Sequence, residues 1–343
     1  MRIALDATYS VGDALSGVGV YSREILEGTA ASGFAGEWDW LYRSQRYWKA
    51  RRLKIPSNVT RRFLADGWGS RSADLFHGLN QRLPRRRFRR QIATFHDLFV
   101  MSGDYSTREF RDRFTAQARD AAAGADMILA VSEFTARQVE ALLGFPKSRI
   151  RVVNHGVIPR AIPNLPRENV VLCVGAIQRR KNQAALVRAF RAMPDDWVLV
   201  LAGSQGFEAG ETMAEIGRSP CASRIRVTGY LSETEIAEWY GRAKIFAFPS
   251  YDEGFGMPVI EAMAAGLPVI TSDQSALPEV AGGAALLVNP GSDDQLAEAL
   301  SSLAKNYDHR ERLVALGRTH AARFTWHRAV GETLQAYREL CPF

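Results

Sequence analysis

Short apolar runs alternate with helix-type stretches along almost the whole chain, and a single proline-bearing segment interrupts this alternation near the middle. Short runs rich in Val, Ile, Leu and Phe are typical of strands that are buried on both faces. Strands that alternate with helices form parallel sheets covered by those helices. The interrupting segment AIPNLPREN, residues 161–169, has the prolines of a linker. The sequence therefore predicts two α/β domains with parallel sheets.

The expected elements divide into two sets that the linker separates. In the first domain, residues 1–160, strands are expected at 2–7, 38–42, 75–77, 92–95, 127–131 and 150–154, and helices at 18–31, 108–123 and 133–143. In the second domain, residues 169–325, strands are expected at 170–174, 198–202, 225–228, 245–248, 269–271 and 285–288. Ligands of open parallel sheets bind beyond the carboxyl ends of the strands, so we expect the site in the cleft between the domains.

Composition sets the broad class of the protein. The chain has 343 residues, enough for two domains with large cores, and its 46% hydrophobic residues indicate a water-soluble protein. No run approaches the roughly 18 apolar residues of a membrane span, and MRIALDATYS lacks the apolar core of a signal peptide, so the cytoplasm is the expected compartment. Cys173, Cys221 and Cys341 are far apart and odd in number, which argues against disulfides or a thiolate metal site.

Basic residues concentrate in one region of the first domain. Residues 43–90 hold 15 of the 44 Lys and Arg against two Asp, a local charge of +13, whereas the whole chain carries +7. Within this region, RYWKARRLK at 46–54 and PRRRFRR at 84–90 mix cationic and aromatic side chains. A solvated face explains such a region, and an anionic membrane surface is the functional alternative. Nothing else resembles a nucleic-acid module, so we expect no nucleic acid as a partner.

Residues 248–279 concentrate glycines and acids in the pattern of a binding site. Glu253 follows an apolar run and precedes a glycine turn, and Pro258 suits the first turn of a helix that ends at Gly266. Glu261 lies about one turn inside that helix. Unpaired amides and the positive helix end between the two acids favour an anion. A site that binds a phosphate between two carboxylates, each able to accept hydrogen bonds from hydroxyl groups, fits a nucleotide sugar. The structural alternative is that the two acids are merely solvated on the surface of a helix.

The block EGFGMPVIEAMAAGLPVITSDQSALPEVAGGAALLVNP, residues 253–290, resembles the donor-site signature of the retaining family 4 glycosyltransferases, two Glu separated by seven residues. The resemblance is dense over residues 170–290 and sparser over 1–156. It implies the GT-B fold, in which two Rossmann-like domains face a cleft and the C-terminal helix, here residues 326–343, crosses back onto the N-terminal domain. It also implies a nucleotide-sugar donor with no metal or other cofactor.

The resemblance assigns roles to the residues of the donor site. Glu253 would hold the hexose and Glu261 the ribose. Loops at 203–207 and 228–233 are the candidates to hold the base, the second largely through its backbone. The expected donor-binding residues are Gly17, Gly19, Tyr230, Gly254, Phe255, Gly256, Met257, Pro258, Val259 and Glu261. Gly17 and Gly19 alone would be a weak signal, because the loop SGVGVY lacks the third glycine and the later acid of a dinucleotide site.

Paired cations follow the first expected strand of the second domain. Arg180 and Lys181 can neutralise the charge that builds on a departing diphosphate. Many relatives carry an Arg where this chain has Ala176, which leaves one expected contact in doubt. No Asp-x-Asp pair stands at a strand end, so we expect no metal.

Histidines follow two expected strands of the first domain. His96 and Asp97, in FHDLF, would emerge at a strand's carboxyl end, although a lone His is more often structural. The segment TFHDL resembles one of bacterial mannosyltransferases of this family, where the His lies near the transferred sugar. We therefore group His96, Asp97, Arg180, Lys181 and Glu253 as catalytic, with His77 on the acceptor side.

The sequence predicts a retaining, metal-independent hexosyltransferase that resembles bacterial O-antigen mannosyltransferases. GDP-mannose is the expected donor, and a saccharide or lipid-linked saccharide of cell-surface polysaccharide synthesis is the expected acceptor. If the acceptor is lipid-linked, residues 43–90 would bind the N-terminal domain to the inner face of the cytoplasmic membrane. The alternatives are a UDP-sugar-dependent enzyme of the same fold, a nucleotide-sugar epimerase and a non-catalytic nucleotide-sugar sensor. A phosphorylase is disfavoured, since no lysine stands in a pyridoxal-phosphate segment.

Overall fold

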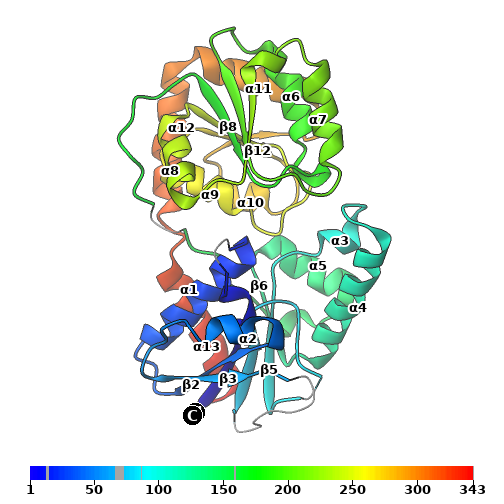
Figure 1. Ribbon diagram of the computed structural model, residues 1–343, viewed down its shortest axis with the longest axis vertical. Helices are drawn as coiled ribbons and strands as arrows, with labels where there is room; N and C mark the ends of the chain where they lie inside the picture. The colour runs from blue at the N-terminus through cyan, green and yellow to red at the C-terminus, as the bar shows by residue number, and fades with distance from the viewer. Residues whose placement is uncertain (13–14, 66–72, 86, 158–159, 343) are drawn as a thin grey trace. The chain divides into compact units, whose positions relative to one another are not determined.

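The computed structural model describes residues 1–12, 15–65, 73–85, 87–157 and 160–342. The chain forms two compact units, Met1–Gly156 with Thr325–Phe343, and Val157–Phe324. Each unit has one parallel sheet with helices on both faces (Figure 1). The segment expected as a linker packs on the second unit, where the Arg167 guanidinium donates to the carbonyl oxygens of Tyr240 (2.6 Å) and Ala243 (2.8 Å).

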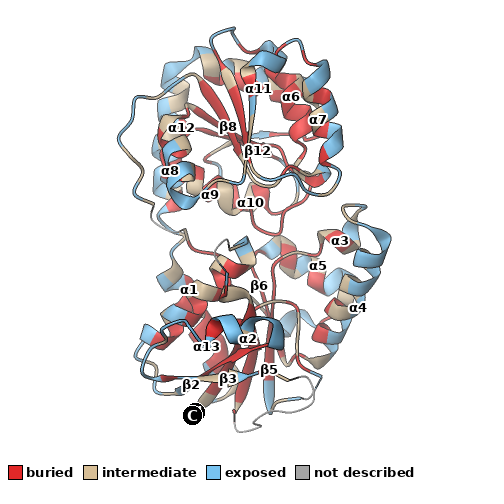
Figure 2. Ribbon diagram, in the orientation of Figure 1, coloured by how far each residue is buried: buried red, intermediate tan, exposed pale blue. Residues whose placement is uncertain are grey.

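The described part of the first unit contains a seven-stranded parallel sheet in the order β3-β2-β1-β4-β5-β6-β7. Its strands are β1 Arg2–Asp6, β2 Glu37–Tyr42, β3 Val59–Phe63, β4 Leu75–Gly78, β5 Arg90–Phe95, β6 Met127–Ala130 and β7 Ile150–Val152. Its helices are α1 Gly17–Ala31, α2 Ser44–Ala50, α3 Phe99–Ser102, α4 Arg108–Gly124, α5 Glu133–Leu143 and α13 Trp326–Leu340. The central strands are buried on both faces, as their apolar runs predict (Figure 2).

The C-terminal helix α13 belongs to the first unit, as the resemblance predicts. It begins at its cap Thr325, whose hydroxyl accepts from the Arg328 amide at 3.2 Å. Its apolar face, which includes Val330 and Tyr337, joins the core formed by α1 and the neighbouring strands. The close approach of α1 to α13 depends on Gly28, because a Cβ atom at this position would lie 2.4 Å from Cγ2 of Val330.

The second unit contains, among its described residues, a six-stranded parallel sheet in the order β10-β9-β8-β11-β12-β13. Its strands are β8 Val170–Val174, β9 Val198–Ala202, β10 Ile225–Gly229, β11 Ile245–Phe248, β12 Val269–Ser272 and β13 Leu286–Val288. Its helices are α6 Gln183–Ala189, α7 Ala209–Arg218, α8 Glu233–Arg242, α9 Met257–Ala264, α10 Leu277–Ala281, α11 Asp293–Lys305 and α12 Tyr307–Ala321. Helices α6, α7 and α11 pack together on one face, and α9, α10 and α12 on the other (Figure 1).

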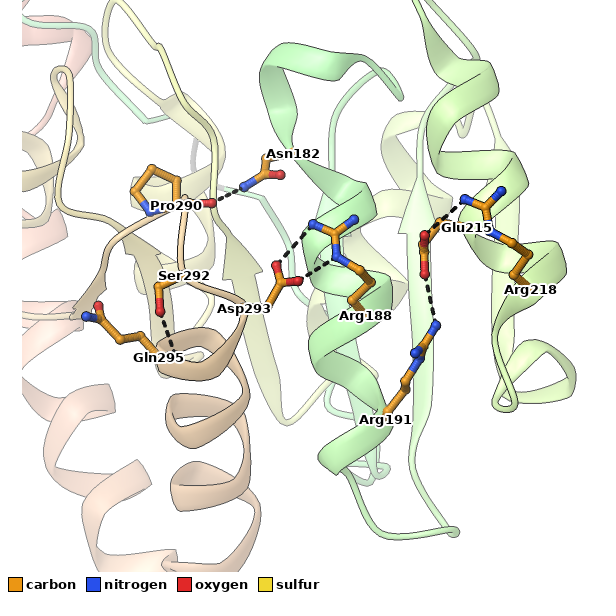
Figure 3. Close-up of polar contacts among 9 residues, drawn as sticks. All are labelled: Asn182, Arg188, Arg191, Glu215, Arg218, Pro290, Ser292, Asp293 and Gln295. Carbon is orange, nitrogen blue, oxygen red and sulfur yellow. Dashed lines mark hydrogen bonds and ion pairs between the residues drawn. The ribbon is translucent and has the colours of Figure 1, made fainter.

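Charged pairs tie the first of these helical layers together (Figure 3). Arg188 of α6 makes a two-point contact with Asp293 in the first turn of α11, at 2.5 and 3.1 Å. Glu215 of α7 accepts from Arg191 at 2.9 Å and from Arg218 at 3.2 Å. These contacts fix the layer beside β8, whose following loop carries the expected cations. No helix in the described part of the chain combines the length and the apolar character needed to span a bilayer.

Candidate active site

The second unit has its topological switch point between β8 and β11. Strand order runs outward from this pair in both directions, so the connections that follow β8 and β11 leave toward opposite faces of the sheet. The carboxyl ends of the two strands therefore flank a crevice, which is the position where open α/β sheets bind ligands. Arg180 and Lys181 follow β8, and Glu253 follows β11. The topology thus brings together the cations and the first acid of the predicted site.

The loop after β8 depends on glycine and on one asparagine. Gly175 has φ of +140°, and a Cβ atom at Gly203 would lie 2.0 Å from the Gly175 carbonyl oxygen, so the two backbones approach closely. Asn182 follows Lys181 in the left-handed region, with φ of 56°. Its side-chain amide donates to the carbonyl oxygen of Pro249 at 3.2 Å. It also donates to the carbonyl oxygen of Pro290 at 2.7 Å (Figure 3). Asn182 therefore ties the loops after β8, β11 and β13 to one another.

Glu253, Lys181 and Arg180 form a charged cluster. Lys181 Nζ lies 2.5 Å from Oε1 of Glu253, and Arg180 Nη1 lies 3.0 Å from Oε2. Between 9% and 12% of each side chain is exposed. Burial alone would raise the pKa of Glu253, but the two cations outweigh it and lower the pKa to about 2. Burial lowers the pKa of Lys181, and the Glu253 carboxylate opposes that change. Glu253 is therefore ionised throughout the physiological range.

Helix α9 begins beside this cluster, and Gly256 permits the turn into it. Gly256 has φ of +98°, and a Cβ atom there would lie 2.6 Å from Cδ2 of Leu277. Pro258 has no N–H, and the Val259 amide donates to the Gly256 carbonyl oxygen at 2.9 Å. Pro258 and Val259 therefore offer no free amide to a diphosphate. Within residues 256–259, the amides of Gly256 and Met257 are the ones expected to bind it.

Glu261 lies in α9 and is held from two sides. Its Oε1 lies 2.8 Å from Nη1 of Arg160, and its Oε2 accepts from the Tyr240 hydroxyl at 3.0 Å. Burial raises the pKa of Glu261, and Arg160 opposes that rise. Nη2 of Arg160 also lies 3.0 Å from Oε2 of Glu233, the first residue of α8. Glu233 ends the expected base loop 228–233, whereas Arg160 and Tyr240 were not predicted, because each is far from Glu261 along the chain and stands in no motif.

The remaining donor residues of the second unit are close to these elements in sequence. Gly254 and Phe255 lie between Glu253 and Gly256, and the Phe255 ring is buried against Phe324 with centroids 5.8 Å apart. Tyr230 follows β10 at the edge of the sheet and is 62% exposed. The fold leaves this ring open to solvent, so its proposed contact with a base stays a prediction.

His77 lies at the end of β4 in the first unit and is fully buried. Its Nδ1 is 2.6 Å from the Tyr337 hydroxyl of α13, and its Nε2 is 2.8 Å from the Thr94 hydroxyl. Burial lowers its pKa to about 3, so the ring is neutral at neutral pH. These contacts connect α13 to the sheet, and the predicted acceptor role of His77 stays a prediction.

His96 and Asp97 follow β5, and only the His is buried. His96 Nε2 donates to the Leu79 carbonyl oxygen at 3.0 Å, which leaves Nδ1 as the acceptor nitrogen of the neutral ring. Burial lowers its pKa to about 4. Its ring also stacks on that of His155 with centroids 5.4 Å apart. Asp97 is half-buried, and its catalytic role stays a prediction.

Gly17 and Gly19 lie in the first turn of α1, which begins at Gly17 and not at residue 18 as predicted. The reason is the cap residue Ser16, whose hydroxyl accepts from the Gly19 amide at 3.4 Å and starts the helix one residue early. A Cβ atom at Gly19 would lie 2.9 Å from the Tyr9 carbonyl oxygen, so Gly19 is needed for packing. Among the described side chains, no three His, Cys, Asp or Glu gather as metal ligands would.

Two family models match the chain and together span most of it. Glycosyltransferase Family 4 matches residues 70–160, and Glycosyl transferases group 1 matches residues 158–320, which include the whole Glu253 to Glu261 segment. The chain is a glycosyltransferase. The division between the two models falls close to the boundary between the two structural units.

Curated relatives of this glycosyltransferase include mannosyltransferases and D-inositol 3-phosphate glycosyltransferases. The O-antigen chain mannosyltransferase B of Escherichia coli is 29% identical over 78% of this chain and 74% of the relative. A D-inositol 3-phosphate glycosyltransferase of Nocardioides is 30% identical over 62% of this chain and 54% of the relative. The serotype-specific mannosyltransferase WbdA of Escherichia coli is 26% identical over 68% of this chain. The match spans only about a third of WbdA, at 32%.

Solved structures share the fold of the glycosyltransferase over nearly its full length. Sucrose-phosphate synthase from Thermosynechococcus elongatus has a TM-score of 0.81 and 23% identity, and the match covers 99% of this chain and 98% of that one. HepE from Anabaena, in complex with UDP and glucose, has a TM-score of 0.75 and 16% identity over 99% and 100% of the two chains. At these identities the likeness establishes the GT-B fold alone.

Proposed function

We propose that this glycosyltransferase transfers mannose from GDP-mannose to a saccharide or lipid-linked saccharide acceptor in cell-surface polysaccharide synthesis. The cluster of Arg180, Lys181 and Glu253 at the switch point carries the proposal, since it sets two buried cations beside the start of α9. The names of two curated relatives, an O-antigen mannosyltransferase and WbdA, favour mannose. The UDP complex of HepE favours the alternative, a UDP-sugar donor in the same fold.

The proposed reaction is a front-side transfer that retains the anomeric configuration. The bond from the sugar's C1 to the diphosphate oxygen breaks, and Arg180, Lys181 and the amides of Gly256 and Met257 stabilise the departing charge. The acceptor hydroxyl attacks C1 from the same face, and its proton moves to the departing phosphate oxygen. The cations do the electrostatic work that a metal would otherwise do. An inverted product in NMR spectra would rule this course out.

The other residues take supporting roles in this proposal. Glu253 keeps Lys181 charged, and its remaining lone pairs accept from hexose hydroxyls together with the backbone of Gly254 and Phe255. The first unit binds the acceptor, with His96 and Asp97 near the transferred sugar. A neutral His96 suits this role, because a neutral ring can accept a hydroxyl proton through Nδ1.

The donor site is tested by calorimetric titration of GDP and UDP in metal-free buffer. We expect the wild type to bind GDP, and Glu261→Ala to weaken binding by about tenfold or more, because a charge-assisted hydrogen bond to ribose is lost. The matched control is Glu298→Ala on the exposed face of α11, which should bind as the wild type does. A preference for UDP would overturn the mannose assignment, and failure to bind either nucleotide would overturn the proposed activity.

Product analysis separates this activity from its alternatives. A nucleotide-sugar epimerase would convert the donor with no acceptor present, whereas a sensor would bind the donor and leave it unchanged. The intact pair of Glu253 and Glu261 weighs against a sensor. Formation of a new glycosidic bond only when an acceptor is added would exclude both alternatives.

The basic region 43–90 presents exposed apolar side chains that suit peripheral attachment to an anionic membrane. Trp48 of α2 is 69% exposed, and Leu53 and Phe63 are 45% and 46% exposed. Arg51 lies over the Trp48 ring, with Cζ 5.4 Å from its centroid. A hollow of about 680 Å³ in the same unit is lined by further cations, Arg82, Arg85, Arg87 and Arg113. Interfacial aromatics beside basic residues are the usual elements of such a contact.

Vesicle co-sedimentation tests this attachment. At low salt we expect binding to vesicles that contain an anionic lipid and none to neutral vesicles, with binding falling as salt screens the contact. Trp48→Ser should reduce binding severalfold, whereas Tyr307→Ser should not, although Tyr307 of α12 is similarly exposed at 63%. Equal reduction by the two substitutions, or none by either, would contradict a role for this surface.

A further inference from the structure

Arg160 is the first residue that the structure describes after Val157, which opens the second unit. Its guanidinium contacts two carboxylates of that unit. Nη1 lies 2.8 Å from Oε1 of Glu261, and Nε and Nη2 each lie 3.0 Å from Oε2 of Glu233. Only 15% of the Arg160 side chain and 10% of the Glu261 side chain are exposed, whereas Glu233 is 75% exposed. Arg160 therefore bridges one buried and one surface carboxylate.

The two carboxylates belong to the two halves of the proposed nucleoside site. Glu261 is the acid proposed to accept from the ribose hydroxyls, and Glu233 ends the segment 228–233 proposed to meet the base. Tyr240 completes the arrangement, since its fully buried hydroxyl donates to the other oxygen of Glu261 at 3.0 Å and its ring centroid lies 5.7 Å from Cζ of Arg160. Each oxygen of Glu261 thus has one protein donor, and its remaining lone pairs can accept from a diol.

Arg160 also controls the charge of Glu261. Burial favours the protonated acid, and the negative charge of Glu233 adds to the rise in the pKa of Glu261. The Arg160 guanidinium opposes this rise through its charge and its hydrogen bond, and the hydrogen bond from Tyr240 lowers the pKa as well. A protonated Glu261 would carry a proton on one oxygen and would be a weaker acceptor for two hydroxyl donors.

We propose that Arg160 is a positioning residue for the nucleoside half of the donor. It holds Glu261 ionised and oriented toward the ribose diol, and through Glu233 it fixes the start of α8 beside the base segment. Arg160 need not touch the donor. The inference rests on the proposed donor site. It places a residue that determines specificity for the ribose near the beginning of the second unit.

The test compares a nucleoside diphosphate with its 2′,3′-dideoxy form, GDP or UDP being chosen by which binds the wild type. In the wild type, loss of the diol should weaken binding by about tenfold to a hundredfold, as for hydrogen bonds to a charged group. Arg160→Gln should weaken binding of the ribose form by about tenfold and leave the dideoxy form within about twofold, so that most discrimination disappears. The control Arg242→Gln removes another two-point Arg–carboxylate pair of the same unit, with Glu168, and should change neither affinity.

The pH dependence separates positioning from a general loss of structure. In Arg160→Gln the pKa of Glu261 rises further, so discrimination for the diol should return as the pH is raised and Glu261 ionises. Arg160→Lys keeps the positive charge but loses the planar guanidinium that contacts two carboxylates at once. This variant should retain the wild-type pH profile and part of the discrimination between the ribose and dideoxy forms. Equal weakening of both nucleotide forms by Arg160→Gln at every pH would overturn the inference, as would unchanged discrimination. A wild type that binds neither GDP nor UDP would overturn the proposed donor site and this inference with it.

Discussion

Lys181→Ala is expected to lower kcat for sugar transfer by about a hundredfold to a thousandfold, the usual effect of removing one preorganised donor from a developing anion. Lys181 Nζ is buried beside Glu253, so no solvent cation can replace it without reorganisation. Arg180 keeps its own contact with Glu253 at 3.0 Å, which holds the loop in place. Steady-state transfer assays at saturating donor measure this effect on kcat, because the lost interaction acts mainly on the departing diphosphate.

Arg179 supplies the matched control for Lys181. It lies in the same turn, but its side chain is 52% exposed and its ion pair with Glu208 is 3.4 Å long. Arg179→Ala should leave kcat within about twofold, since exposed ion pairs contribute little. If Lys181→Ala and Arg179→Ala had equal effects, or if the former raised only KM, Lys181 would not stabilise the departing charge.

Glu253→Ala is expected to lower the free energy of unfolding of the second unit by about 3–5 kcal/mol, the usual cost of breaking a buried ion pair. The substitution leaves Arg180 and Lys181 buried with no carboxylate between them. Hydrogen exchange of β8 and β11 amides in increasing denaturant measures this free energy within the second unit. The control Glu208→Ala, which breaks the exposed pair with Arg179, should change it by no more than about 0.5 kcal/mol.

The pKa of Glu253 predicts how this difference depends on pH. Its folded-state pKa is lowered from the ordinary value of 4.5 to about 2, so its ionised form stabilises the fold above 4.5. That contribution to stability is lost as the pH falls from about 4.5 toward about 2. The difference between wild type and Glu253→Ala should therefore be constant at neutral pH and shrink only in acid. A difference that vanished near neutral pH would show that Glu253 is not held ionised by its two cations.

Local pattern predicted the sheets well wherever strands are buried on both faces. The missed strand β3, Val59–Phe63, lies at the edge of the seven-stranded sheet, and its sequence VTRRF has two cations and no continuous apolar run. Helix α2, Ser44–Ala50, was also missed, since it has no apolar face that would mark it in the sequence. Only Ala50 of its seven residues is buried. An edge element is stabilised mainly by its neighbours in space, so its own sequence carries a weak signal.

The sequence was enough to predict two α/β domains and the acids and cations at the strand ends, because these depend on local periodicity or on a contiguous motif. The packing of α13 on the first unit followed from the family resemblance. Which side chains meet depends on the tertiary structure. It placed Glu253 between Arg180 and Lys181 by bringing β8 and β11 together, and it placed Arg160 on Glu261. Ion pairs between residues far apart along the chain follow from strand order and burial, which leave no periodic trace in the sequence.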